Sequence, residues 1–278
     1  MNLSDRAVWH IESRLGEAFT LGDLAGLCAV SPFHLVRAFR AGADCAPMAY
    51  ARARRLSEAA RRLAAGRDDI LAVALDAGYG SHEAFTRAFA SHFGLPPSVV
   101  RRSRSLANLT LTEPITMDTS RLVDLPAPRL RDRAAFRVTG LRRAYGPEDA
   151  GAIPAQWQAF MARADEVPDP VPGAAYGLCE ATDTGEDSGF RYTAGVETAP
   201  GRQAPPGLET VAVPAGRYAV FAHSGHITGI RNAYFTIWNR ALAAHGLTAR
   251  RAPDFERYDD RFDPETGNGT VEIWIPID

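Results

Sequence analysis

Two arginines stand at matching positions in two copies of a short sequence pattern. Arg37 in the segment 31–39 corresponds to Arg87 in the segment 81–89, fifty residues later. In each copy a short apolar segment, 21–27 or 71–77, ends a few residues before a serine suited to cap a second helix. This arrangement is typical of a helix-turn-helix motif. A guanidinium group can donate two hydrogen bonds to guanine in the major groove, so the pattern predicts two DNA-reading helices.

Helical periodicity separates an apolar face from a polar face in both serine-capped helices. Leu35, Ala38 and Phe39 face inward in the first copy, as Phe85, Phe89 and Phe93 do in the second. The residues predicted to face outward and contact DNA are Phe33, Val36, Arg37, Arg40, His82, Glu83, Thr86 and Arg87. An ordinary solvated face would give the same pattern in one helix, but its duplication in register favours DNA contact.

A helix over about 46–64 is predicted between the two copies. Its length of about 27 Å is comparable to the roughly 34 Å between successive major-groove faces, so one rigid helix could hold both reading helices. Candidates for phosphate contacts are Arg52, Arg54 and Arg55 on this helix and Arg101 and Arg102 later in the chain. A solvated face explains any single one of them equally well.

A carboxylate near the end of the chain suggests a second kind of site. In the segment 271–277, strand alternation places Glu272, Trp274 and Pro276 on one face. A buried carboxylate beside an indole is unfavourable unless it is paired, and a cationic aromatic ligand could supply the partner. An internal pair with one of the many arginines is the alternative. Further aromatic candidates for the lining of a ligand cleft, each also suited to a core, are Tyr145, Trp157, Tyr176, Tyr192 and Trp238.

Composition excludes several kinds of chemistry. The chain of 278 residues has no lysine, which excludes a Walker A or Schiff-base lysine. Its three cysteines lack zinc-ligand spacing, and His223 and His226 have no suitably spaced carboxylate. We therefore expect no catalytic residue, no metal site and no cofactor. We also expect a cytoplasmic protein, because no signal peptide or membrane helix is evident.

Charge and periodicity divide the chain into two domains. Residues 1–105 hold 14 arginines against 10 acidic residues, a charge of +4, whereas residues 106–278 hold 17 against 23, a charge of −6. We predict an all-α double helix-turn-helix domain of about seven helices over 1–107, a linker over 108–120, and an α+β domain over 121–278. Its predicted strands are 136–141, 175–179, 191–197, 210–213, 218–222, 255–258 and 271–277, with helices near 153–164 and 227–245. A strand followed by a Trp-containing helix occurs twice, which indicates pseudo-twofold symmetry.

The helical part resembles the DNA-binding domain of the AraC/XylS transcription regulators. The resemblance rests on LGDLAGLCAVSPFHLVRAF and on ILAVALDAGYGSHEAFTRAFASHFGLPPSVVRR. It implies a double-stranded DNA operator, RNA polymerase as a partner, and base contacts from Phe33, Val36, Arg37, His82, Glu83 and Arg87. Val36 stands where the family often has a polar residue, and His82-Glu83 replaces a commonly glutamine-like pair, so no base preference is carried over.

The second part resembles the GyrI-like effector-binding domain. The matching segments are RYTAGVE, VPAGRYAVFAHSG, APDFERYD and VEIWIPI. The resemblance implies an aromatic-lined ligand cleft between the two repeats, with Glu256 or Glu272 as its acid. We therefore expect a transcription regulator of the activator type, controlled by a small amphipathic or cationic effector. The alternatives are a hydrolase of a natural product and a protein that sequesters a toxin.

Overall fold

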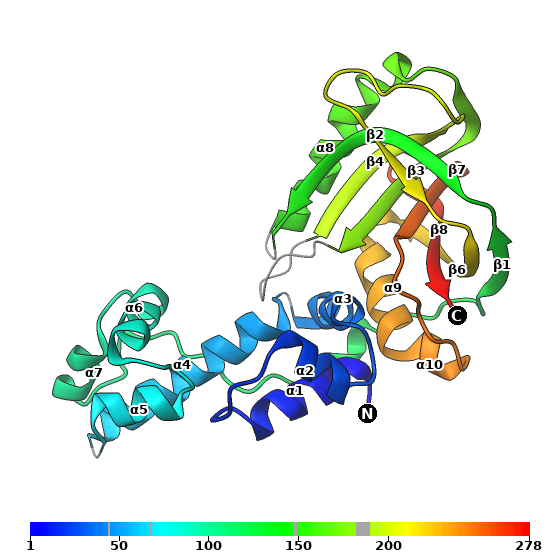
Figure 1. The fold of residues 1–278 in the computed structure, drawn as a ribbon. Helices are drawn as coiled ribbons and strands as arrows, with labels where there is room; N and C mark the ends of the chain where they lie inside the picture. The colour runs from blue at the N-terminus through cyan, green and yellow to red at the C-terminus, as the bar shows by residue number, and fades with distance from the viewer. Residues whose placement is uncertain (44, 67, 147–148, 182–189) are drawn as a thin grey trace. The chain divides into compact units, whose positions relative to one another are not determined.

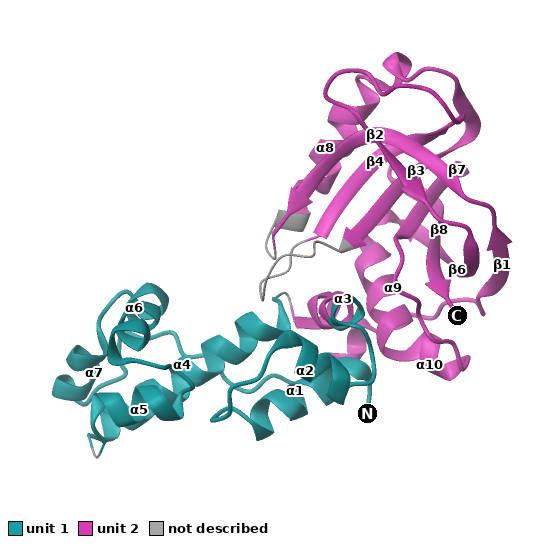
Figure 2. Ribbon diagram, viewed as in Figure 1, with its two compact units in different colours: residues 1–35, 45–117 teal, residues 36–44, 118–278 magenta. Residues whose placement is uncertain are grey.

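The computed structural model describes residues 1–43, 45–66, 68–146, 149–181 and 190–278 (Figure 1). The chain forms two compact units, of which one contains residues 1–35 and 45–117 and the other residues 36–44 and 118–278 (Figure 2). The boundary falls inside helix α3 (Pro32–Ala43), so most of this helix belongs to the second unit. Residues 108–117, predicted as linker, belong to the helical unit.

The predicted helical architecture is confirmed. Besides α3, the helices over the described part of residues 1–117 are α1 (Leu3–Ser13), α2 (Leu21–Leu27), α4 (Pro47–Ala65), α5 (Ile70–Asp76), α6 (His82–Phe93) and α7 (Pro97–Ser103). Thr20 begins α2 through a reciprocal capping box with Asp23. Ser81 caps α6 by accepting a hydrogen bond from the backbone N–H of Ala84 at 3.1 Å. The capping residues thus mark the helix starts that the sequence predicts.

Helix α4 supports the second helix-turn-helix. Leu56 and Leu63 of α4 are buried in one cluster with Val73 of α5 and with Phe85 and Phe89 of α6. The inward apolar face predicted for α6 is therefore the one that packs. The opposite face of α6 is left for solvent or a partner.

The segment after α7 runs back along α4 and is held there by buried polar groups. Arg54 donates to Glu12 at 2.9 Å and to the carbonyl of Thr112 at 2.9 Å. Ser57 accepts from the N–H of Thr112, also at 2.9 Å. Arg54 is buried, so its predicted phosphate contact is wrong: its guanidinium is used inside the unit.

The second unit is built on one antiparallel sheet of eight strands in the order β1-β6-β8-β7-β3-β4-β2-β5. Its strands are β1 (Arg129–Arg133), β2 (Phe136–Tyr145), β3 (Pro170–Ala181), β4 (Phe190–Thr198), β5 (Glu209–Val213), β6 (Gly216–His226), β7 (Asp254–Asp263) and β8 (Asn268–Ile277). Helix α8 (Ile153–Met161) follows β2, and α9 (Ile230–Thr236), a π-helical turn (Ile237–Ala241) and α10 (Leu242–Ala244) follow β6. Every predicted strand is present, and β1 is an additional one.

The strand order confirms the pseudo-twofold character. Strands β2, β4 and β3 with α8 correspond to β6, β8 and β7 with α9. The first strand of each half pairs with the other half: β1 precedes β2 in the chain but pairs with β6, and β5 precedes β6 but pairs with β2. The halves meet where β3 pairs with β7.

The register at this central pair sorts side chains between the two sheet faces. Gly177 lies opposite Glu256 and Cys179 opposite Asp254, so these four residues share one face. The other face carries a core that includes Leu178, Phe255, Trp274, Tyr176 and Tyr218. The face with the two carboxylates is the one that helices cover, as hydrogen bonds from α8 and α9 show.

We predict that Arg54→Met lowers the free energy of unfolding of the helical unit by about 3 kcal/mol, because it leaves a partly buried carboxylate without its partner. Amide hydrogen exchange in α4 across a urea series measures the change. The exposed residue Arg102 supplies the control, and Arg102→Met is expected to stay within about 0.5 kcal/mol of wild type. Equal effects from the two variants would contradict the structural role of Arg54.

Candidate functional site

Glu256 lies at the centre of a buried cluster on the covered face of the sheet. Its side chain accepts hydrogen bonds from Tyr192 at 2.5 Å, Tyr258 at 3.0 Å and Tyr234 at 3.2 Å. The residue is only 8% exposed. In the part of the chain that the structure describes, no arginine or histidine is ion-paired with this carboxyl group. Glu256 is therefore a buried acid held by three tyrosine hydroxyls.

Burial raises the pKa of Glu256, although the hydrogen bonds from Tyr192 and Tyr258 act in the opposite direction. Burial also raises the pKa of the hydroxyls of Tyr192, Tyr234 and Tyr258, which consequently stay protonated as donors. The free energy of placing a charge here is unfavourable unless a cation approaches.

Aromatic rings from several elements enclose the acid. Trp157 of α8 donates its indole N–H to the Tyr192 hydroxyl at 3.0 Å, and its ring meets that of Tyr258 edge-on at 5.1 Å. Gly177 on β3 makes room for them, because a Cβ atom at this position would overlap both the Tyr192 hydroxyl and the Glu256 carboxylate. We call Trp157, Tyr192, Tyr234, Glu256 and Tyr258 the Glu256 cluster.

A second carboxylate, Asp254, lies two residues earlier on the same face and binds an arginine of α3. Nη2 of Arg37 donates to Oδ2 of Asp254 at 2.6 Å, and Nη1 donates to Sγ of Cys179 at 2.7 Å. The Arg37 guanidinium also lies 4.7 Å from the centre of the Tyr234 ring. All four residues belong to the second unit. Tyr234 therefore links this ion pair to the Glu256 cluster.

Glu272, the other predicted acid, points to the opposite face of the sheet. Ile273 is the register partner of Glu256, and alternation turns the neighbouring Glu272 away. Glu272 accepts from Arg129 at 2.6 Å, Arg261 at 2.8 Å and the Trp274 indole at 3.1 Å. Although burial acts to raise the pKa of Glu272, these hydrogen bonds lower it overall. The internal arginine pair considered from the sequence is the arrangement observed.

The structure brings together only part of the predicted ligand lining. Glu256, Trp157 and Tyr192 meet in one cluster. Tyr176 and Trp274 lie in the core of the other face, and Tyr145 hydrogen-bonds Gln156. Trp238 is buried in the π-helical turn. Sequence reasoning missed Asp254, Tyr234 and Tyr258, although Asp254 and Tyr258 stand two positions either side of Glu256 and so share its face.

The predicted DNA-reading residues differ between the two copies. On α6, His82, Glu83 and Arg87 are exposed and Thr86 is half-buried. On α3, Phe33 and Arg40 are half-buried, whereas Val36 is only 5% exposed. The outward orientation predicted for Val36 and Arg37 is therefore wrong in this structure, because this part of α3 packs within the second unit.

The other two predicted phosphate contacts on α4, Arg52 and Arg55, also differ. Arg52 is exposed. Arg55 donates to the backbone carbonyls of Leu15 and Glu17, and its guanidinium lies over the Phe19 ring. Arg55 therefore holds the turn after α1 in position, and the phosphate contact of Arg52 stays a prediction.

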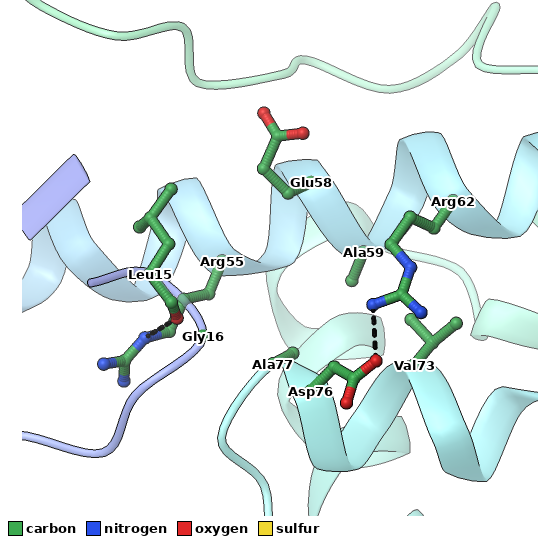
Figure 3. Close-up of a pocket in the computed structure, with 9 residues that line it drawn as sticks. All are labelled: Leu15, Gly16, Arg55, Glu58, Ala59, Arg62, Val73, Asp76 and Ala77. Atoms are coloured by element: carbon green, nitrogen blue, oxygen red, sulfur yellow. Dashed lines mark hydrogen bonds and ion pairs between the residues drawn. The ribbon is translucent and has the colours of Figure 1, made fainter. Parts of the chain in front are cut away.

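A pocket of about 240 Å³ in the helical unit lies between this turn, α4 and α5 (Figure 3). The figure shows Arg62 reaching Asp76, which it contacts at 2.8 Å. Arg62 also binds Asp68, and Glu58 binds Arg54 and Arg61. These charges are paired with one another, so the pocket is a weaker candidate site than the Glu256 cluster.

Membrane-spanning helices and metal-binding groups are both absent from the described residues. No helix among them is both long and apolar enough to cross a membrane. Nor do they contain a group of three or more metal-binding side chains with suitable geometry.

Comparison with known proteins decides the family. A family model described as a GyrI-like small molecule binding domain matches residues 126–278, and a helix-turn-helix domain model matches residues 24–103. The chain belongs to the GyrI-like family. It is a DNA-binding transcriptional regulator in which an AraC-type helix-turn-helix domain precedes the GyrI-like domain, as its sequence predicts.

Relatives named as regulators cover both domains of this GyrI-like protein. Transcriptional regulator Rob of Salmonella typhimurium is 27% identical over 289 residues, which is 99% of this chain and 97% of Rob. Transcriptional regulator BrlR of Pseudomonas aeruginosa is 35% identical over 185 residues, which is 66% of each chain. These matches favour a regulator over the hydrolase considered from the sequence.

A solved structure, that of SAV2435 bound to tetraphenylphosphonium, covers 55% of this chain and 94% of its own, with 18% identity and a TM-score of 0.45.

The opposite pKa shifts of the two glutamates predict opposite pH responses. The raised pKa of Glu256 means that its contribution to stability is present at low pH and is lost as pH rises through the native pKa. Glu256→Gln should therefore raise the melting temperature relative to wild type more in mildly alkaline than in acidic buffer. The pKa of Glu272 is lowered, so its carboxylate stabilises the fold at pH values above the pKa that Glu272 has in the unfolded chain. Glu272→Gln should therefore have a lower melting temperature than wild type in alkaline buffer. In acidic buffer the two melting temperatures should become equal. Thermal unfolding across a pH series measures the melting temperatures of both variants. If both variants differ from wild type with the same sign in alkaline buffer, the opposite pKa shifts of the two glutamates are refuted.

Proposed function

We propose that the Glu256 cluster binds a flat aromatic cation and that this binding controls a transcription regulator whose α3 and α6 helices read double-stranded DNA. The observation that carries the proposal is a buried carboxyl group surrounded by aromatic rings and paired with no arginine or histidine of the described chain. Such a group is unfavourable in the free protein and becomes favourable when a cation occupies the site.

The chemistry of the cluster selects charge and shape together. Tyr192, Tyr258 and Trp157 offer ring faces or edges to a flat apolar body, and Glu256 offers a negative charge where water is excluded. Cation–π and ion-pair interactions are both strengthened in such surroundings. A neutral ligand of the same shape would gain only the apolar contacts. Because burial raises the pKa of Glu256, cation binding should strengthen as the pH rises through that pKa.

We predict that Glu256→Gln weakens binding of N-methylacridinium by about tenfold or more, because the amide keeps the shape of the site but removes its charge. Isothermal titration calorimetry at mildly alkaline pH measures this affinity, and uncharged acridine is the ligand control. Its affinity should change little. Glu272→Gln, on the opposite face, is the variant control and should bind both ligands like wild type. An equal loss of acridine and N-methylacridinium in Glu256→Gln would assign Glu256 a structural role instead.

Helix α6 supports the DNA part of the proposal. Its exposed face carries His82, Glu83 and Arg87, while Phe85 and Phe89 fix the helix on α4. Arginine on the exposed face of a helix-turn-helix reading helix can bind guanine directly. Activation, with RNA polymerase as a partner, and a cytoplasmic location are parts of this proposed role.

We predict that Arg87→Ala weakens specific DNA binding by about ten- to a hundredfold, the value of one good bidentate base contact. The duplex is first selected from a random library with the wild-type protein, and its affinity is measured by fluorescence anisotropy. Arg143→Ala, an exposed arginine of the sheet, controls for the lost charge. The melting temperature should stay unchanged, since Arg87 is exposed. Wild-type affinity in Arg87→Ala would show that α6 does not read bases.

A further inference from the structure

Arg37 already occupies part of the covered sheet face as a bound cation would. Its guanidinium meets a carboxylate, Asp254, lies over an aromatic ring, Tyr234, and donates to a sulfur atom, Cys179. The Arg37 side chain is 17% exposed and that of Asp254 only 1%. Burial acts to lower the pKa of Arg37, but Asp254 and the neighbouring groups raise it overall, so the guanidinium is charged. A cation from the chain's own helix thus sits beside the Glu256 cluster.

We propose that Arg37 is an internal ligand of the effector site, and that the effector is a planar guanidinium or amidinium compound that displaces it from Asp254. The proposal rests on the cation-binding function proposed above and narrows it. It adds a chemical class, a planar cation with N–H donors, and a second anchor, Asp254. It also identifies Arg37 as the residue through which effector binding would affect DNA binding.

The pairing of Arg37 with Asp254 is incomplete, because one oxygen of the carboxylate can still accept a hydrogen bond. Only Oδ2 of Asp254 binds Arg37, while the buried Oδ1 accepts no hydrogen bond from another described residue. The second Arg37 donor is directed at Cys179, a weak acceptor because burial raises the pKa of the thiol and keeps it neutral. A free guanidinium could bind both Asp254 oxygens side by side, the geometry in which such pairs are strongest.

Displacement of Arg37 would change what α3 can do. Arg37 is also the residue that the repeat pattern predicts to read DNA, and one guanidinium cannot bind Asp254 and a base together. Other hydrogen bonds to this stretch of α3 go to backbone oxygens: Asn239 donates to Ala38 at 3.4 Å, Arg231 to Arg40 at 3.1 Å and Arg121 to Gly42 at 3.3 Å. These are weaker than a charged pair in a buried position. The ion pair is therefore the contact that withholds the Arg37 guanidinium from any other partner.

Ligand competition tests the occupancy of the site. Phenylguanidine is compared with phenyltrimethylammonium, which carries the same ring and charge but no N–H donor. We expect phenylguanidine to bind wild type about tenfold more tightly or better. In Arg37→Ala its affinity should rise by about tenfold again, because the internal competitor is gone and the carboxylate is unpaired. Equal phenylguanidine affinity in wild type and Arg37→Ala would overturn the proposal.

A second variant tests the coupling to DNA. Asp254→Asn keeps Arg37 but removes the charge that holds it, so affinity for the selected duplex should rise by about tenfold without any ligand. The preference for phenylguanidine over phenyltrimethylammonium should also disappear. Asp259→Asn is the matched control, because Asp259 lies on the same strand, faces the other way and also pairs with arginine. Wild-type DNA affinity in Asp254→Asn would overturn the coupling.

N-methylacridinium separates this inference from the proposed function. If N-methylacridinium binds in a Glu256-dependent way while phenylguanidine does not compete with Arg37, the site binds cations but Arg37 is not its internal ligand. If N-methylacridinium fails to bind both wild type and Arg37→Ala, the cation site itself is refuted.

Discussion

The antiparallel pairing of β3 with β7 joins the two halves of the sheet and places two carboxyl groups, Asp254 and Glu256, on its covered face. A buried carboxylate raises the free energy of the fold unless neighbouring groups donate hydrogen bonds to it or carry the opposite charge. Three tyrosine hydroxyls surround one carboxyl, and an arginine of α3 approaches the other. Gly177 lacks a side chain because the cluster fills the space above it. Many of the side chains on the covered face thus stabilise the two buried acids of β7 beside its pairing with β3.

The two acids receive different kinds of compensation. The hydroxyl groups around Glu256 stabilise a carboxylate only in part, so its pKa remains raised. Asp254 has a full cationic partner, yet its Oδ1 accepts no hydrogen bond from another described residue. Glu272 on the other face is fully paired, with three arginines from strands β1 and β7 and a lowered pKa. The acids on the covered face are incompletely paired, so this face is the candidate binding surface. The acid on the opposite face is fully paired and has a structural role.

Periodicity in the sequence was enough to predict the helices and all strands except β1, whose sequence RLRDR shows no apolar alternation. It could not tell Glu256 from Glu272, because both stand in alternating segments and only the register between β7 and β8 turns them apart. Alternation around Glu256 could have identified Asp254 and Tyr258. Tyr234 and the burial of Arg37 could not be foreseen, since they depend on packing between segments far apart in the chain.

The exchange of β1 and β5 means that neither half of the sheet can be completed from one continuous piece of chain. During synthesis β1 leaves the ribosome long before its partner β6, and β8 leaves last. The helical unit, built mainly from contacts between nearby residues, has the topology that forms sooner. A nascent chain thus passes through a stage in which Arg37 exists and Asp254 does not. Proteolytic loss of β7 and β8 would likewise leave Arg37 without Asp254 as its partner.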